Sequence, residues 1–325
     1  MNKNVLNYLR THTYTVLLSI VEISWLMHML TYNLWYLFTL YWPATITMIF
    51  GSFVAGFTSE GGAFIAFPVF TKVLGLTSLQ ASTFGLMIQS IGMTCASAAI
   101  YSLRVKVLKR VILWTSIGGA IGMFIGLRFI SLPSLYPRLL FTLLVISFGV
   151  ALYISKWHLK LKHHYTTGNW SNFQRVLFTI TGVVGGIISS QVGSGINMLV
   201  YMVLSLSFGI YDKISVPTSV IIMAINSVVG FAIHYFSDTI SEMWNYWIVA
   251  VPVVALGAPL GAYLVHKVTN DFIVGFILLL IILEAITTFL MISFDLYLVV
   301  FSCLVTLLFL FLFFWLLRFR MKYEG

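Results

Sequence analysis

Long apolar segments follow one another along almost the whole chain, and only short polar loops separate them. Charged residues make up 8% of the sequence, whereas about a quarter of the residues in a soluble domain are charged. A membrane helix needs about 20 consecutive apolar residues, and a spanning β-barrel needs alternating strands of about ten. Runs such as Leu304 to Leu317 do not alternate. The sequence therefore predicts an all-α, polytopic membrane protein.

Twelve apolar segments are expected to form the membrane helices. Several of those beside two glycine-rich interruptions are short for a hydrocarbon core about 30 Å thick, so we expect half-spans that meet near its middle. The first stretch contains Glu22 and His28 and lacks a small-residue cleavage site, so it is expected to be retained as a helix. The segments are 14–31, 35–56, 61–75, 77–102, 111–131, 135–155, 176–190, 195–210, 216–236, 244–265, 272–290 and 294–317.

Basic residues predict which loops face the cytoplasm, because loops rich in Lys and Arg stay on that side. Lys3, Arg10 and the basic loops 104–110 and 156–175 all fall on one side for a single order of crossings. We therefore expect a multi-pass protein of the cell (inner) membrane with both chain termini in the cytoplasm.

The same order of crossings predicts two inverted repeats of about five helical segments each. Segment 77–102 runs inward and ends in a basic loop, whereas 216–236 runs outward and ends in an acidic one. Inverted repeats with discontinuous helices are typical of secondary transporters. The expected parts are an N-terminal helix, repeat 1, a cytoplasmic linker, repeat 2, and a C-terminal helix with a basic tail, at 1–34, 35–155, 156–175, 176–290 and 291–325.

Two glycine-rich breaks interrupt apolar runs at corresponding places in the two halves. The first break is Gly56-Phe-Thr-Ser-Glu-Gly-Gly-Ala63, and the second is Ser189-Ser-Gln-Val-Gly-Ser-Gly195. Glycine and polar residues end an apolar helix rather than extend it. Broken helices at matching places in two halves are the best indication in a sequence of a transporter's substrate site.

The residues after each break follow a common order. The first copy has Gly61-Gly62-Ala63, Pro68, Gly75-Leu76 and Ala81-Ser82-Thr83; the second has Gly193-Ser194-Gly195, Gly209-Ile210 and Pro217-Thr218-Ser219. This order resembles the sulfite exporter TauE/SafE family of membrane permeases. The resemblance implies export or uptake of a small sulfur-containing or carboxylate anion across the cytoplasmic membrane.

Helices that stop inside a membrane leave backbone groups without partners, and lipid offers none. The helix N-termini near Gly62 and Ser194, with their N–H groups and positive dipole ends, are expected to form an anion site. The alternative is that glycines only permit close helix crossing, which we favour for the spaced glycines of 118–126.

Two polar side chains on the helices after the breaks, Gln89 and Asn226, are expected either as walls of the site or as hydrogen bonds between helices. The expected substrate-binding residues are Ser59, Gly61, Gly62, Ala63, Gln89, Gly193, Ser194, Gly195, Asn197 and Asn226.

Glu60 is expected to couple transport to protons. A carboxylate at bilayer depth costs roughly 2.5–3.5 kcal/mol on insertion scales, and an ionised one would repel an anion. Both difficulties disappear if Glu60 carries a proton when substrate is bound, with Gln191 as its neutral counterpart in the second half. The alternative is that Glu60 only caps the broken helix.

Five other charged or titratable residues lie in or beside apolar segments. Lys72, Arg128 and Arg138 are expected to extend to the membrane surface. Glu284 and His234 are expected to belong either to a proton path or to a structural pairing.

Taken together, these patterns predict a secondary transporter whose partners are a small anion, the lipid bilayer and protons. A passive anion channel is the alternative, and an intramembrane enzyme is a weaker one because no catalytic motif is present. No cofactor or metal is expected. Nucleic acid is not expected either, because the basic residues lie in short loops between spans.

Overall fold

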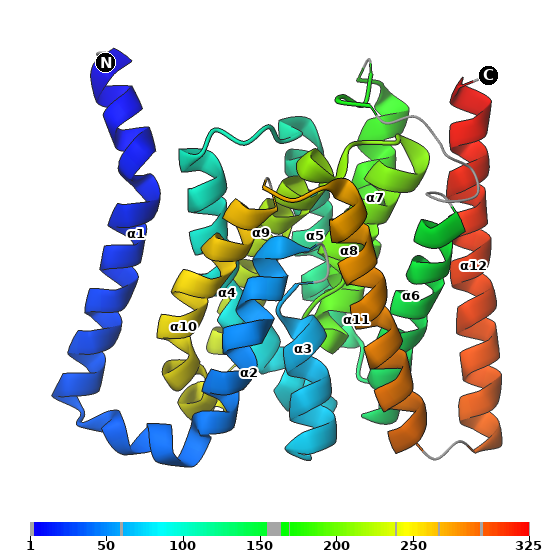
Figure 1. Ribbon diagram of the computed structural model, residues 1–325. Helices are drawn as coiled ribbons and strands as arrows, with labels where there is room; N and C mark the ends of the chain where they lie inside the picture. The colour runs from blue at the N-terminus through cyan, green and yellow to red at the C-terminus, as the bar shows by residue number, and fades with distance from the viewer. Residues whose placement is uncertain are drawn as a thin grey trace.

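The computed structural model describes residues 3–58, 61–154, 164–168, 170–237, 239–265, 267–292 and 295–324. This part of the chain is helical, with no β-strand, as predicted (Figure 1). Four short helices adjoin longer ones: η1 (Leu34–Tyr36) precedes α2, η2 (Val69–Val73) follows α3, η4 (Val203–Ser207) follows α8 and η5 (Ser241–Met243) precedes α10. The α-helices are α1 (Lys3–Thr31), α2 (Leu37–Phe57), α3 (Ala63–Pro68), α4 (Ser78–Ser102), α5 (Lys109–Phe129), α6 (Leu135–Tyr153), α7 (Asn172–Val192), α8 (Ile196–Met202), α9 (Asp212–Phe236), α10 (Trp244–Leu264), α11 (Asn270–Met291) and α12 (Leu296–Glu324).

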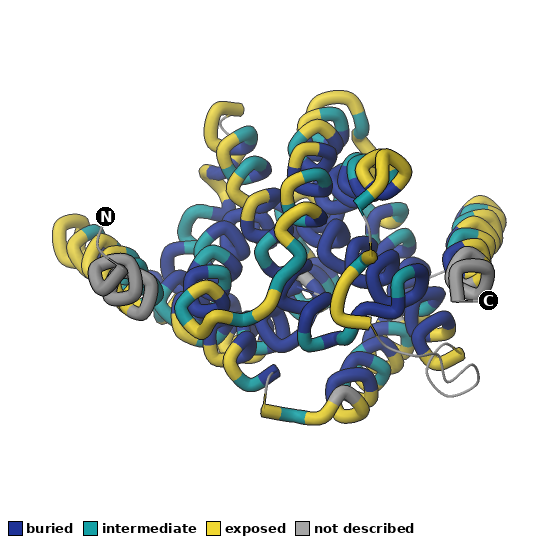
Figure 2. The backbone as a smooth tube through the Cα atoms, turned by 90° about the horizontal axis from the view of Figure 1, so that it is seen from above, coloured by how far each residue is buried: buried dark blue, intermediate teal, exposed yellow. Residues whose placement is uncertain are grey.

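Ten helices of the described chain are long and apolar enough to cross a membrane. Seen from above, exposed residues lie around the outside and buried residues fill the centre (Figure 2). The two end helices, α1 and α12, flank the bundle, and few of their residues are buried. This distribution, with apolar side chains facing outward, is that of a protein surrounded by lipid and confirms the predicted polytopic membrane fold.

Each break joins a long helix to a short arm that turns back beside it (Figure 1). The arms are α3 with η2, residues 63–73, and α8 with η4, residues 196–207. At about 1.5 Å per residue, arms of this length cover roughly half of a 30 Å core. The arms are therefore half-spans, and both chain termini lie on the same side of the molecule (Figure 1).

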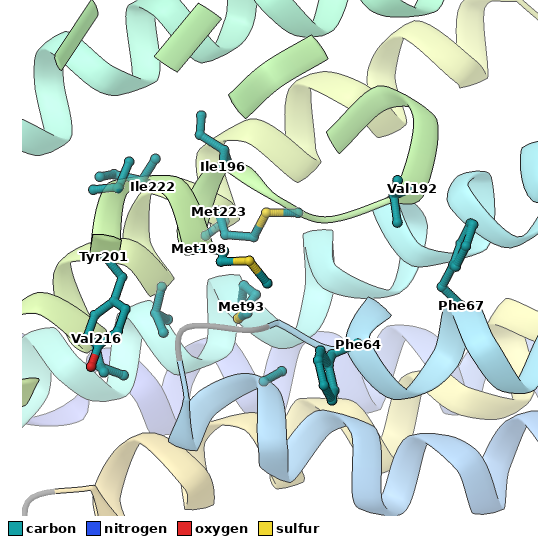
Figure 3. Close-up of a cluster of buried hydrophobic side chains, with 14 of the residues drawn as sticks. Phe64, Phe67, Met93, Val192, Ile196, Met198, Tyr201, Val216, Ile222 and Met223 are labelled. Atoms are coloured by element: carbon teal, nitrogen blue, oxygen red, sulfur yellow. The ribbon is translucent and has the colours of Figure 1, made fainter. Parts of the chain in front are cut away.

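A buried apolar core surrounds the arms. Figure 3 shows Val192 and Ile196 on the two sides of the second break, with Met93 and Met198 in the core beside it. All four side chains are fully buried. The start of the second arm is thus held inside the protein.

Glycines allow α5 and α7 to cross at very short range. A Cβ at Gly118 would lie 2.1 Å from the Thr179 carbonyl oxygen, and one at Gly122 would lie 2.0 Å from that of Val183. The prediction that the glycines of 118–126 serve helix packing is confirmed. Because α7 leads into the second break, this crossing also fixes where the break lies.

Gly122→Ala is expected to destabilise the protein, because a backbone carbonyl cannot move aside for the new methyl group. Overpacking of this kind costs about 1–3 kcal/mol, and the midpoint of thermal unfolding should fall by several degrees. Gly275→Ala on α11 is the matched control, since a Cβ there meets nothing within 4 Å. Equal unfolding midpoints for the two variants would contradict the close crossing.

Candidate functional site

The two breaks, more than 130 residues apart in the sequence, meet inside the bundle. Gly61 has a left-handed backbone (φ +82°), which favours glycine. A Cβ on Gly61 would lie 2.8 Å from Ser194 Oγ, 2.9 Å from Asn197 Nδ2 and 2.8 Å from Gln89 Oε1. The first break therefore contacts the second through polar side chains and leaves no room for a side chain of its own.

Gln89 connects the two breaks from α4. Its Nε2 donates hydrogen bonds to the carbonyl oxygens of Gly193, at 2.7 Å, and Gly85, at 3.1 Å. Because both partners are acceptors, the orientation of the amide is fixed, and Oε1 must face Gly61. Gln89 is 2% exposed, and its Oε1 has no hydrogen-bond partner among the described residues. A buried acceptor without a donor is costly unless a ligand supplies one.

Side chains cap the second break. The N–H of Gly195 donates to Asn197 Oδ1 at 3.2 Å, and the N–H of Ile196 donates to Ser189 Oγ at 3.0 Å. Ser194 Oγ donates to the same Asn197 oxygen at 3.2 Å. These two backbone groups are therefore paired within the break, so the expectation that the start of α8 presents unpaired N–H groups does not hold for Gly195 and Ile196. The polar groups that face Gly61 are instead the side chains of Ser194 and Asn197.

Asn226 lies on α9 beside the first residue of α8. A Cβ on Gly119 would lie 2.9 Å from Asn226 Oδ1 and 2.5 Å from Ile196 Cδ1. Asn226 is 1% exposed, and neither atom of its amide has a partner within the described chain. The buried amide of Asn226 therefore lies beside the second break, facing Gly119 of α5. Gly119, expected to serve packing alone, also makes room for this candidate site residue.

The first break is only partly described. Thr58 ends α2, with its hydroxyl donating to the Val54 carbonyl oxygen at 2.9 Å, and Ala63 begins α3. A Cβ on Gly62 would lie 3.6 Å from Gln89 Cγ. Ser59 and Glu60, the latter predicted to couple protons, lie outside the described residues.

A polar cavity of about 170 Å³ borders the second break. It is next to Gly193, since a Cβ there would lie 2.9 Å from the carbonyl oxygen of Ser82, one of the lining residues. Gln191 also lines it and donates from Nε2 to the carbonyl oxygens of Gly126 and Ile130, at 3.2 and 3.1 Å. The amide of Gln191 thus joins α7 to the end of α5. The polar lining residues are Ser78, Ser82, Ser131, Ser190 and Gln191.

Comparison with known protein families decides the identity of the chain. The model of the family described as sulfite exporter TauE/SafE matches residues 44–288. The chain belongs to this family. The matched range includes both breaks, Gln89 and Asn226, and it leaves out α1 and α12. No curated protein and no solved structure matches the chain.

Membership in the TauE/SafE family makes the chain one of a family of membrane transporters. The two breaks on which the sequence resemblance depends are the same two segments that meet at Gly61 and Ser194. Four of the residues expected to bind substrate, Gly61, Gln89, Ser194 and Asn197, are therefore neighbours in space. Their role in binding remains a prediction.

Among the other charged residues of this TauE/SafE chain, Glu284 and His234 have the structural pairing that was one of their two expected roles, whereas Lys72 differs from expectation. Lys72 does not extend to the membrane surface: its side chain is 6% exposed and pairs with Glu284 at 3.0 Å, so that prediction was wrong. Arg128 is exposed, and Arg138 donates to the Leu76 carbonyl oxygen at 3.2 Å. His234 pairs with the hydroxyl of Thr239 at 2.7 Å.

Proposed function

We propose that this chain is a secondary transporter, a permease or exporter, that moves a small anion across the cytoplasmic membrane. The proposed anions are sulfite, an organosulfonate or a carboxylate. The observation that supports this most is the contact of Gly61 with Ser194 and Asn197, which brings two broken membrane helices to one buried polar point. Broken helices that meet in this way form the substrate sites of several transporter folds.

The chemistry at this point suits an oxyanion that carries a proton. The Asn197 amide nitrogen carries two N–H bonds and faces Gly61 beside the Ser194 hydroxyl, so it can donate to an anionic oxygen. Gln89 Oε1, an acceptor without a described partner, would receive the O–H of hydrogensulfite. Neutral donors also bind an anion without a fixed positive charge, so the anion can leave again.

The proposed movement is a change of access between two inverted repeats, 35–155 and 176–290, with both chain termini in the cytoplasm. In support, the two short arms each turn back beside a long helix, and both termini lie on one side (Figure 1). The polar cavity beside Gly193 includes the start of α4 and the connection between α5 and α6. We assign it as an approach to the site from the face opposite the termini.

Glu60→Gln is expected to remove the pH dependence of transport. In the proposed cycle Glu60 is protonated when the anion is bound, and a glutamine keeps that neutral form at every pH. The measurement is the initial rate of anion flux into proteoliposomes over a range of external pH. A variant with an unchanged rate and an unchanged pH profile would show that Glu60 only caps the helix.

A flux experiment tests the function itself. Purified protein in proteoliposomes is given sulfite, sulfate, thiosulfate and short sulfonates, with and without a pH gradient. Accumulation of one anion against its gradient supports a secondary transporter, and flux that only dissipates a gradient supports a passive channel instead. Gln89→Leu, which removes both the acceptor and the connection between the breaks, is the matched inactive control. Absence of flux for every anion contradicts the proposal.

A further inference from the structure

Three buried polar side chains on α5 and α9 have no hydrogen-bond partner within the described chain. They are Asn226 of α9, whose amide nitrogen and amide oxygen are both unpaired, and Thr115 and Ser116 of α5, whose hydroxyls are unpaired. All three side chains are 9% exposed or less. A buried polar group without a hydrogen bond is costly, and in native proteins such groups are usually paired with protein, water or a ligand.

The three side chains lie along one side of α5. A Cβ on Gly119 would lie 2.9 Å from Asn226 Oδ1, so this side of α5 meets α9. Ser116 precedes Gly119 by three residues and Thr115 precedes it by four, which places both on the same side of the helix, one turn away. We call Thr115, Ser116 and Asn226 the polar seam.

The polar seam runs from the second break toward the face of the molecule that carries both chain termini. On that face α5 begins, after the loop that joins it to α4 (Figure 1). There the N–H of Leu108 donates to Thr218 Oγ1 of α9 at 3.1 Å, which joins the two helices at this end. The carboxylate of Asp212, which begins α9, is buried and accepts a hydrogen bond at 2.8 Å. Lys109 and Arg110 begin α5 and are exposed, so an anion on this face meets positive charge.

The polar seam has the chemistry of an oxyanion site. The amide of Asn226 can donate two N–H bonds to anionic oxygens and can accept the O–H of a protonated oxyanion, and the two hydroxyls can donate one bond each. None of these groups carries a charge, so an anion that binds to them can also leave. The seam therefore offers the same kinds of donor and acceptor as the point where the two breaks meet.

We propose that the polar seam is a second subsite for the anion, between the contact of Gly61 with Ser194 and the face that carries the termini. Its place on a transport path rests on the proposed function, whereas the binding of an oxyanion there does not depend on flux. In this structure the seam is closed, since a Cβ on Gly119 would lie 2.5 Å from Ile196 Cδ1. An anion therefore reaches the seam when α5 and α9 move apart, and the polar cavity beside Gly193 serves the opposite face.

Cysteine labelling tests the seam without transport. The background is Cys303→Ser, in which the remaining Cys95 is buried. Ser116→Cys in proteoliposomes is treated, on the face that carries the termini, with a membrane-impermeant methanethiosulfonate reagent that bears a short sulfonate. Ile117→Cys is the matched control, because Ile117 is the next residue of α5 and its side chain is 43% exposed on the outside of the bundle. The reagent reacts with a thiolate, which forms in a hydrated polar site and not in lipid, so Ser116→Cys should react on the order of tenfold faster.

An excess of ethanesulfonate should slow the labelling of Ser116→Cys several-fold, because both anions compete for the same groups. Equal rates for Ser116→Cys and Ile117→Cys, or a rate that ethanesulfonate does not slow, overturns the proposal. If ethanesulfonate protects Ser116→Cys but the wild-type protein carries no anion in the flux experiment, the proposed function fails and the subsite stands.

Asn226→Leu gives an independent measurement. Because the amide has no partner in the closed seam, its removal should leave the unfolding midpoint in detergent unchanged or higher. Protection by ethanesulfonate should be lost in Ser116→Cys/Asn226→Leu, because the main donor to the anion is gone. A lower midpoint would show that the amide of Asn226 stabilises the fold instead, and it would overturn the proposal, as would full protection in the double variant.

Discussion

Replacing Gly61 with alanine is expected to abolish anion transport while the helices stay folded. Two costs add at this position: a left-handed backbone (φ +82°) and a Cβ within 2.9 Å of Gln89, Ser194 and Asn197. Strain of about 1–2 kcal/mol and overpacking of about 1–3 kcal/mol together disfavour the observed arrangement of the two breaks. The added methyl group would also occupy the space in which we place the anion. The measurement is flux of the transported anion into proteoliposomes.

Gly75→Ala separates the effect on the site from the effect on the backbone. Gly75 has a similar backbone (φ +68°), but nothing described lies within 4 Å of a Cβ there. This variant therefore carries about the same strain without the contact, and it should keep its flux. If Gly61→Ala and Gly75→Ala lose flux equally, the loss comes from strain in the arm, and the contact between the breaks is not the substrate site.

The sequence predicts the breaks because their cause is local. Adjacent glycines within apolar runs cannot continue a helix without cost, so both interruptions are visible in the order of residues. The bounds of a helix are also set locally, and the expected segment 77–102 agrees with the observed α4, Ser78–Ser102. The meeting of the two breaks at Gly61 and Ser194 was also expected, because the sequence predicts two halves of opposite orientation with the breaks at matching places.

The fine structure of the second break could not be predicted from local patterns. Ser189 caps Ile196 from seven residues earlier, a spacing that no standard capping motif contains. Asn197 accepts from both Ser194 and Gly195, which closes the turn on itself. The expectation of open N–H groups does not hold for Gly195 and Ile196, because the side chains of Asn197 and Ser189 accept from them.

The pairing of Lys72 with Glu284 was missed for a different reason. The two residues are 212 positions apart, and each alone satisfies a common rule: a lysine near a helix end extends to the interface, and a lone glutamate pairs with something nearby. Only the folded arrangement of the first arm against α11 shows that each is the other's partner. The partner of each charge therefore lies in the opposite half of the chain.

Glu284→Gln is expected to destabilise the protein severely, because the ammonium of Lys72 would remain buried without a counter-charge. Removing one member of a buried ion pair costs about 3–5 kcal/mol, mostly from the charge left behind. The unfolding midpoint in detergent should fall by on the order of 10 °C. Glu242→Gln is the matched control, since Glu242 is an exposed carboxylate on η5, and exposed substitutions usually change stability by less than about 0.5 kcal/mol.

A second substitution distinguishes this cause from a simple loss of packing. In Lys72→Met/Glu284→Gln no charge remains, and methionine keeps most of the length of the lysine side chain, so most of the lost stability should return. Rescue of this kind would show that the two charges stabilise the contact between the first arm and α11 only as a pair. A double variant less stable than Glu284→Gln alone would show instead that Lys72 has a more important partner than Glu284.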